Sequence, residues 1–166
     1  MTVNRVIVGG VAGLVATAPM TVVMLALHRL LPAREQYPLP PEEITGILMD
    51  RAGAGDPRDR EQRWPLTLLT HFGFGAVSGV GLAFVGSWTR HSPTAIGVLY
   101  SLAVWAISYL GWLPAAKILP LATRHPARRN LLMLVAHAVW GASAGTTIDR
   151  LDRWMRVGTT SSRDDA

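Results

Sequence analysis

Two histidines, His71 and His137, stand in the same local pattern and are the residues of this chain best suited to polar chemistry. Residues 71–79 read HFGFGAVSG and residues 137–145 read HAVWGASAG. Both segments follow His-x-x-x-Gly-Ala-x-x-Gly, and in both an aromatic residue, Phe74 or Trp140, comes directly before the first glycine of this pattern. An imidazole can hydrogen-bond, exchange a proton near neutral pH, or ligate a metal or haem iron. Because an ionisable group is costly in apolar surroundings, this pair is a candidate site.

Three interpretations of the histidine pair are open. In the preferred one, neutral imidazoles hydrogen-bond across helices, each bond contributes about 1 kcal/mol, and no cofactor is bound. In the second, the pair responds to protons, because histidine titrates near neutral pH. In the third, both imidazoles ligate a metal ion or haem b, whose propionates would meet Arg63 and Arg129 about 12 Å nearer the helix ends. The hydroxyl partners that the first interpretation predicts are Thr17, Thr21, Ser101 and Ser108.

Four long uncharged runs must position these residues. They cover residues 6–27, 64–88, 93–116 and 130–148, and each is bounded by charged residues or histidine. A helix needs about 20 mostly apolar residues to cross the hydrocarbon core of a bilayer. The chain is 49% hydrophobic and only 16% charged. The sequence therefore predicts an all-α, multi-pass membrane protein: a four-helix transmembrane bundle in a bacterial inner membrane.

The charged residues favour a lipid partner and no nucleic acid. The formal net charge is +5, and the arginines, including Arg63 and Arg129, flank the apolar runs, where they would meet lipid headgroups. The chain has no cysteine, which excludes disulfides and thiolate metal sites. No phosphate-binding glycine loop, zinc-protease motif or pair of carboxylates within the runs is present, so we expect no catalytic residue and no metal site.

The apolar runs belong to one domain. We expect a single transmembrane domain over residues 1–157, followed by a disordered tail at 158–166. The polar loop at 32–63 is the longest connection, and its segment at about 41–52 predicts a short amphipathic helix, because two glutamates open it and apolar residues then share one face. The charged end of this loop, residues 53–63, predicts a flexible linker.

An internal repeat relates the two halves of the chain. At the offset that superposes the two histidine patterns, Arg63 also matches Arg129. A tandem duplication of a two-helix hairpin explains these matches, and two helices per unit make the copies parallel. Small residues let membrane helices approach closely, so six glycines predict packing surfaces: Gly9, Gly13, Gly75, Gly79, Gly141 and Gly145.

The chain resembles the YagU-like group of small bacterial inner-membrane proteins of unknown function. The resemblance is carried by a glycine-rich first helix, by His-x-x-Trp in the last helix, and by an arginine-rich end. These residues are Gly9, Gly10 and Gly13, then His137 and Trp140, then Arg150, Arg153 and Arg156. The resemblance implies an inner-membrane protein connected with acid tolerance, and it supplies no catalytic residues.

From these features we expect a non-enzymatic accessory, assembly or stress-related membrane component, partnered by lipid and by a second copy or another membrane protein. The alternative is a small transporter or proton-coupled permeation unit, which with four helices would need to be oligomeric. The second alternative is a haem b electron carrier held by His71 and His137. Four spans put both termini on one side of the membrane, and the distribution of arginine favours the side outside the cytoplasm.

Overall fold

The computed structural model describes the backbone of residues 2–53, 63–88 and 91–164, and the side-chain environments of residues 3–53, 63–88 and 91–155. Most of this described part lies in four long helices, and it contains no strand. The helices are α1 (Thr2–Arg29), α3 (Trp64–Gly86), α4 (Pro93–Ile107) and α6 (Ala127–Asp164). The predicted all-helical fold is thus confirmed, as are four helices long and apolar enough to cross a membrane.

The third apolar run is less regular than the others. After α4, the chain forms a π-helical segment, η2 (Ser108–Trp112), and one further helical turn, α5 (Leu113–Ala115). A π-helix is wider than an α-helix, and such segments within α-helices are frequent at functional sites. Pro114 lies at the start of α5, and a proline has no N–H for the regular hydrogen-bond pattern of the preceding turn.

The helix ends differ from the predicted boundaries, most of all in the last helix. The last run was predicted to end at residue 148, but α6 begins at Ala127 and continues to Asp164. Extending an existing helix adds one hydrogen bond per residue without a new nucleus, so polar residues can continue it. The helix therefore includes most of the predicted tail at 158–166. The predicted flexible linker falls largely on residues 54–62, outside the described part of the chain.

Three short elements build the connections at the loop end of the bundle, where the first two long helices are joined: η1 (Ala33–Glu35), α2 (Pro40–Arg51) and η3 (Ala122–Arg124). The helix α2 lies where the sequence predicted one at about 41–52. The Thr45 and Thr70 hydroxyls hydrogen-bond across α2 and α3 at 2.9 Å. The Arg51 guanidinium donates to the carbonyls of Ala116 and Lys117 at 3.0 and 2.7 Å. Through these contacts α2 connects α3 to the end of α5.

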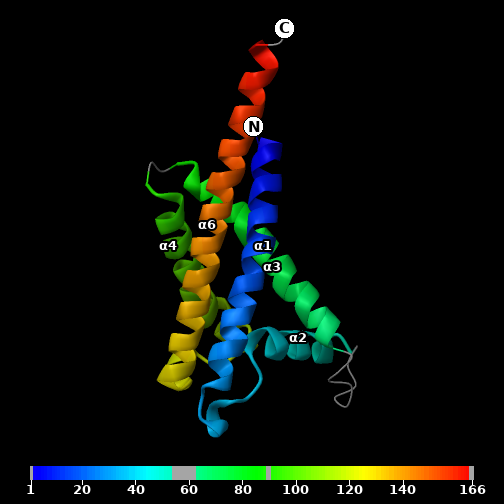
Figure 1. The fold of residues 1–166 in the computed structure, drawn as a ribbon. Coiled ribbons are helices and arrows are strands. Elements are labelled where there is room, and N and C mark those ends of the chain that lie inside the picture. The colour runs from blue at the N-terminus through cyan, green and yellow to red at the C-terminus, as the bar shows by residue number, and fades with distance from the viewer. Residues whose placement is uncertain (1, 54–62, 89–90, 165–166) are drawn as a thin grey trace.

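The long helices pack in the order α3, α1, α6, α4 (Figure 1). The extensive contacts are those of α1 with α3, of α1 with α6, and of α4 with α6. By contrast, α3 and α4 make few contacts, and α3 leans away from the bundle toward the loop end (Figure 1). The N-terminus and the end of α6 lie at the opposite, terminal end. We call each interface between two neighbouring long helices a seam. Three of the four seams are therefore closed, and the fourth, between α3 and α4, is splayed.

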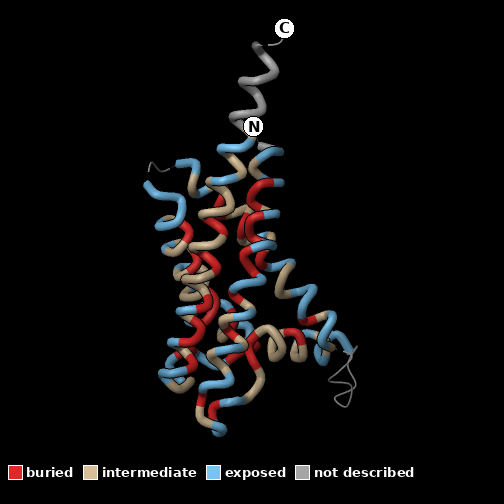
Figure 2. The backbone as a smooth tube through the Cα atoms, viewed as in Figure 1, coloured by how far each residue is buried: buried red, intermediate tan, exposed pale blue. Residues whose placement is uncertain are grey.

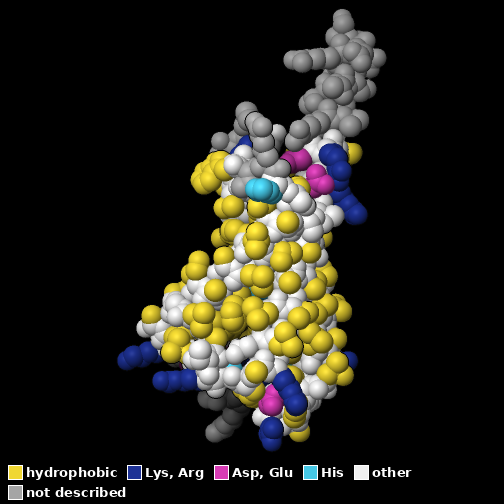
Figure 3. Space-filling view, turned by 90° about the vertical axis from the view of Figure 1, so that its left-hand side faces the viewer, with side chains coloured by type: hydrophobic (Ala, Val, Ile, Leu, Met, Phe, Trp, Pro, Cys, Tyr) yellow, Lys and Arg dark blue, Asp and Glu magenta, His cyan; other side chains and the backbone are white. Residues whose placement is uncertain are grey.

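Buried residues line the inner faces of the long helices, whereas their outer faces are exposed (Figure 2). Many of these exposed side chains are large and apolar, among them Val11, Val77, Leu99 and Ile107. Hydrophobic side chains cover the middle of one face of the molecule, and charged side chains gather toward its two ends (Figure 3). A soluble protein rarely exposes so broad an apolar surface, and a lipid environment accounts for it.

The helix backbones approach each other closely at several glycines. A Cβ atom added to Gly9 would lie 2.6 Å from the carbonyl oxygen of Gly79, and one added to Gly79 would lie 2.6 Å from Cα of Gly13. Across α4 and α6, a Cβ atom added to Gly141 would meet the backbone of Gly97. These backbones touch because neither side carries a side chain at the crossing.

Candidate functional site

A cavity of about 250 Å³ lies in the loop-side half of the bundle, where α3 and α4 separate. Its walls come from α1, α2, α3, α4, η2, α5 and α6, and they are mostly apolar. Both candidate histidines, His71 on α3 and His137 on α6, line it. The structure thus brings to one cavity the two residues that the sequence repeat singled out.

From the exposure of its lining residues, we place the mouth of the cavity between α3 and η2. Two lining residues mark it: Phe74 on α3 is 51% exposed, and Trp112 on η2 is 46% exposed. They belong to the two helical segments that splay apart, and the same segments carry further exposed apolar side chains, among them Val77 on α3 and Leu110 on η2. At the loop end, α2 borders the mouth with Leu48, which is as exposed as Trp112, and completes the wall with the buried Thr45. In a bilayer this mouth would open sideways toward lipid.

The π-helical segment η2 forms the wall opposite α3. Its Tyr109 side chain is buried, stacks on Trp105 with ring centroids 5.9 Å apart, and meets the His137 ring edge-on at 6.4 Å. Within the same segment, the Trp112 indole N–H donates to the Ser108 hydroxyl at 3.2 Å. The irregular helix therefore places aromatic rings beside His137.

The hydrogen bond of His137 fixes its tautomer. Its Nδ1 lies 2.8 Å from the backbone carbonyl oxygen of Met133. A carbonyl only accepts, so Nδ1 must carry the proton, and the neutral ring then keeps Nε2 as an acceptor. An imidazolium would be costly among these apolar walls. The cavity therefore presents a lone pair on Nε2 of His137.

The other histidine is placed differently. His71 Nε2 is buried and has no hydrogen-bond partner within the described residues. His71 also lines a second, wider cavity of about 940 Å³ between α1, α2 and α3, which the polar residues Glu43, Asp50 and Arg63 help to line. His71 thus stands between the apolar cavity and a polar groove at the loop end.

The predicted hydrogen bonds from the histidines to four hydroxyls do not form among the described residues. The Thr17, Thr21 and Ser101 hydroxyls donate instead to backbone carbonyls of their own helices, at 2.7–2.9 Å. The fourth, Ser108, accepts from an indole N–H. A hydroxyl in a helix can reach the carbonyl one turn earlier, and this local bond satisfies it without a partner on another helix.

Arg63 and Arg129 both lie at the loop end of the bundle, but their surroundings differ. Arg129 is only 6% exposed and donates to the carbonyls of Glu35, Tyr37 and Pro38, each at 2.9 Å. Its guanidinium also lies 3.5 Å from the centroid of the Tyr37 ring. Arg63 forms an ion pair of 3.1 Å with Asp50. Arg129 thus holds the loop between α1 and α2 against the start of α6.

A tyrosine–histidine pair extends the Arg129 contacts, and sequence reasoning missed it. The Tyr37 hydroxyl lies 2.7 Å from Nδ1 of His125, and the two rings stack. Burial lowers the pKa of His125, and the Arg129 charge lowers it further. Burial raises the pKa of Tyr37, although Arg129 opposes this shift. Both shifts favour the neutral forms, in which the phenol donates and the imidazole accepts.

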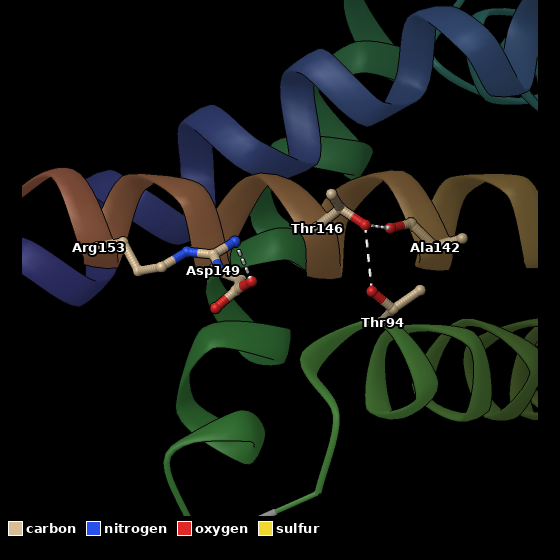
Figure 4. A network of polar contacts seen from close by, with 5 residues as sticks. All are labelled: Thr94, Ala142, Thr146, Asp149 and Arg153. Carbon is tan, nitrogen blue, oxygen red and sulfur yellow. Dashed lines mark hydrogen bonds and ion pairs between the residues drawn. The ribbon is translucent and has the colours of Figure 1, made fainter.

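The terminal end carries a separate polar network (Figure 4). The Thr94 and Thr146 hydroxyls hydrogen-bond across α4 and α6 at 3.1 Å, and Thr146 also donates to the Ala142 carbonyl. One turn further along α6, Arg153 pairs with Asp149 at 2.6 Å. A cavity of about 570 Å³ at this end shares no lining residue with the cavity that contains the histidines.

The fold and the cavity define an all-helical bundle whose four long helices could cross a membrane. The chain belongs to the family described as "Family of unknown function (DUF6789)", whose model matches residues 3–157. No curated protein and no solved structure matches the chain. The family match does not link the chain to the YagU-like group.

Proposed function

We propose that this chain is a non-enzymatic, multi-pass protein of a bacterial inner membrane that binds a lipid-soluble molecule inside its bundle. The observation that carries the proposal is the apolar cavity of about 250 Å³, whose mouth lies between helices of membrane-spanning length. Small-molecule sites are typically mostly apolar concavities with a few polar groups. An accessory role in handling such a molecule fits this geometry, and the four apolar helices of spanning length are the support for a membrane location.

The position of the mouth supports a ligand that arrives through the lipid. Phe74 and Trp112 lie at the mouth, on the splayed segments α3 and η2. The lining contains no aspartate, glutamate, lysine or arginine among the described residues. A water-soluble ion would lose its hydration there without compensation. The same lack of a carboxylate beside the imidazoles is our reason for proposing no catalytic role.

We further propose that the bundle arose by duplication of a two-helix hairpin, with glycine crossings in each copy. The α1–α3 pair is held where Gly13 and Gly75 meet, and Thr17 is the next residue along the crossing. The α4–α6 pair is held where Gly97 and Gly141 meet, with a serine in place of the threonine. Equivalent contacts at equivalent places support a common origin.

Two other functions are less well supported by the geometry. A haem would need its propionates bound, but Arg129 is engaged by three carbonyls and Arg63 by Asp50. Cavities for drug-sized ligands measure about 300–1,000 Å³, and a haem is large even among such ligands. A transporter needs a continuous passage, whereas the cavity at the terminal end shares no lining residue with the other two.

A matched pair of tryptophan substitutions tests the proposed function. Ser78 lines the cavity, whereas the adjacent Val77 is 72% exposed. Ser78→Trp should fill the cavity, and Val77→Trp should leave it open. We expect native mass spectrometry from mild detergent to show an apolar molecule on the wild type and on Val77→Trp, and none on Ser78→Trp. Equal occupancy of all three proteins would mean that any bound lipid lies on the outer surface, and the proposal would fail.

A further inference from the structure

The polar groups of the cavity wall restrict what can bind there. The Thr17 and Ser101 hydroxyls donate to carbonyls within their own helices, and Thr45 and Thr70 hydrogen-bond to each other. These groups are already satisfied. The two histidines are not: His71 Nε2 is buried without a hydrogen-bond partner in the described chain. The ring of His137 hydrogen-bonds to the Met133 carbonyl through Nδ1 and meets the Tyr109 ring edge-on, and neither contact uses its Nε2 as an acceptor. Ser78 and Tyr109 also bring hydroxyls to the wall, but a hydroxyl can turn to donate or accept, so the imidazole nitrogens are the groups that restrict a ligand most.

The tautomer of His137 sets the chemistry of that ligand. Because Nδ1 donates to the Met133 carbonyl, the neutral ring offers Nε2 only as an acceptor. A partner must therefore supply an O–H or N–H donor. A simple hydrocarbon or an ester chain has no such donor. A ligand bearing a hydroxyl would satisfy His137 and remove the cost of an unpaired polar atom in an apolar cavity.

The shape and lining of the cavity favour a flat ring. Aromatic side chains contribute much of the wall: Phe74 from α3, Tyr109 and Trp112 from η2, and Trp140 from α6. Aromatic rings prefer stacked or edge-on neighbours that are themselves aromatic. A volume of about 250 Å³ accommodates one ring system and the beginning of a tail, rather than a whole lipid. The mouth gives the rest of the tail a path to the outer apolar surface.

We infer that the cavity between α3 and η2 takes a lipid-soluble aromatic ring that carries hydroxyl groups, of the quinol class, with a hydroxyl donating to His137 Nε2. A second oxygen of the ring lies toward His71, and the apolar tail leaves between Phe74 and Trp112. This inference rests on the proposed function, since it names the class of molecule that the same cavity binds. It concerns binding alone and includes no electron transfer.

The test compares three probes that share a tail and differ in the ring. They are a decyl-substituted benzoquinol, its dimethyl ether and decylbenzene, each titrated anaerobically against the full chain in dodecylmaltoside. Binding to the folded state raises Tm with ligand concentration, which gives an apparent Kd. We expect the quinol to bind about tenfold more tightly than its ether, the difference that one buried hydrogen bond makes. The ether keeps the ring and the tail but has no donor.

Substitutions at the two histidines test which imidazole accepts the hydrogen bond from the hydroxyl of the quinol. His137→Phe keeps a ring of similar size and should abolish the preference for the quinol over the ether, whereas His137→Gln, which retains an acceptor, should preserve part of it. His71→Phe should weaken binding of the quinol more than binding of the ether or of decylbenzene. It provides the test if His137→Phe does not fold. Val77→Trp, on the outer surface, should leave all three affinities unchanged.

The outcomes separate this inference from the proposed function. If the quinol, ether and decylbenzene bind equally and Ser78→Trp abolishes all three, the cavity binds apolar molecules but the quinol inference is overturned. If none of the probes raises Tm, or if Ser78→Trp has no effect on binding, both are overturned. A quinol preference that persists in His137→Phe and in His71→Phe would also overturn the inference.

Discussion

The seam between α1 and α6 and the seam between α3 and α4 occupy equivalent places in the proposed duplication, yet one is closed and the other open. Trp140 fills the first: it is 4% exposed, and its indole N–H lies 3.2 Å from both the Gly13 carbonyl and the Thr17 hydroxyl. Phe74 holds the equivalent place in the other copy and lies half exposed at the cavity mouth. The comparison teaches that a single aromatic residue whose N–H hydrogen-bonds across two helices, here Trp140, can hold those helices together, whereas Phe74 has no such donor.

Truncating these two aromatic residues should have unequal effects, and this is the largest difference that we predict. Trp140→Ala should lower the free energy of unfolding by about 3–5 kcal/mol, because it leaves a large void and two acceptors without the indole. Phe74→Ala should change it by less than about 1 kcal/mol, because Phe74 is already half exposed. Thermal unfolding in detergent measures both. Equal losses would show that Phe74 is part of the core and that the seam is closed.

The two matched arginines should differ for a related reason. Arg129→Gln should cost about 3 kcal/mol, since it removes charged hydrogen bonds to three loop carbonyls that are buried or partly buried. Arg63→Gln should cost about 1 kcal/mol or less, because its Asp50 partner is more than half exposed. Arg128→Gln, next to Arg129 but exposed, is the control. A loss for Arg128→Gln as large as for Arg129→Gln would mean that net charge matters and the buried contacts do not.

Glycine substitutions test whether the hairpin pairs are held by close approach. Gly75→Leu should force α1 and α3 apart and cost about 1–3 kcal/mol, as overpacking does. Gly73→Leu, two residues earlier on the same helix, should be tolerated or slightly stabilising, because nothing lies within 4 Å of the added Cβ. Gly141→Leu should repeat the Gly75 result in the α4–α6 pair. An unchanged Tm for Gly75→Leu and Gly141→Leu would place those faces toward lipid.

The sequence predicts the helices far better than the cavity. Runs of apolar residues bounded by arginine are local signals, so the four long helices follow directly. The histidine repeat also marks two residues that the structure brings to one cavity. The splayed seam has no local signal, because it depends on how several helices meet. Pro114 was a visible sign of irregular helix, but nothing in the sequence specified that a π-helix would place Tyr109 beside His137.

The burial of Arg129 was also beyond sequence reasoning. Its type and position, at the start of an apolar run, are those of an arginine among lipid headgroups. Its partners are backbone carbonyls of residues 35, 37 and 38, and backbone carbonyls look alike in any sequence. Tyr37 and His125 were equally hidden, because they are far apart in the chain and meet only through the loop.

The smallest effect that we predict is a pH dependence confined to the Arg129 end. Burial and the Arg129 charge lower the folded-state pKa of His125 below its ordinary value of 6.5. The unfolded chain therefore binds the proton more readily, so stability should fall as the pH drops below about 6.5, through the window down to the folded pKa. The raised pKa of Glu43 acts in the opposite sense and at lower pH, since burial favours its protonated form.

The measurement is accordingly a difference in stability between wild type and His125→Gln, followed from about pH 7.5 to about pH 5.5 in detergent. We expect the wild type to lose more stability than the variant over this range, because only the wild type must neutralise or expose an imidazolium beside Arg129. In Arg129→Gln the same His125 difference should shrink, because one of the two effects that lower the pKa of His125 is gone. Parallel curves for wild type and His125→Gln would show that the contact of 2.7 Å between the Tyr37 hydroxyl and Nδ1 of His125 does not couple the loop to protons.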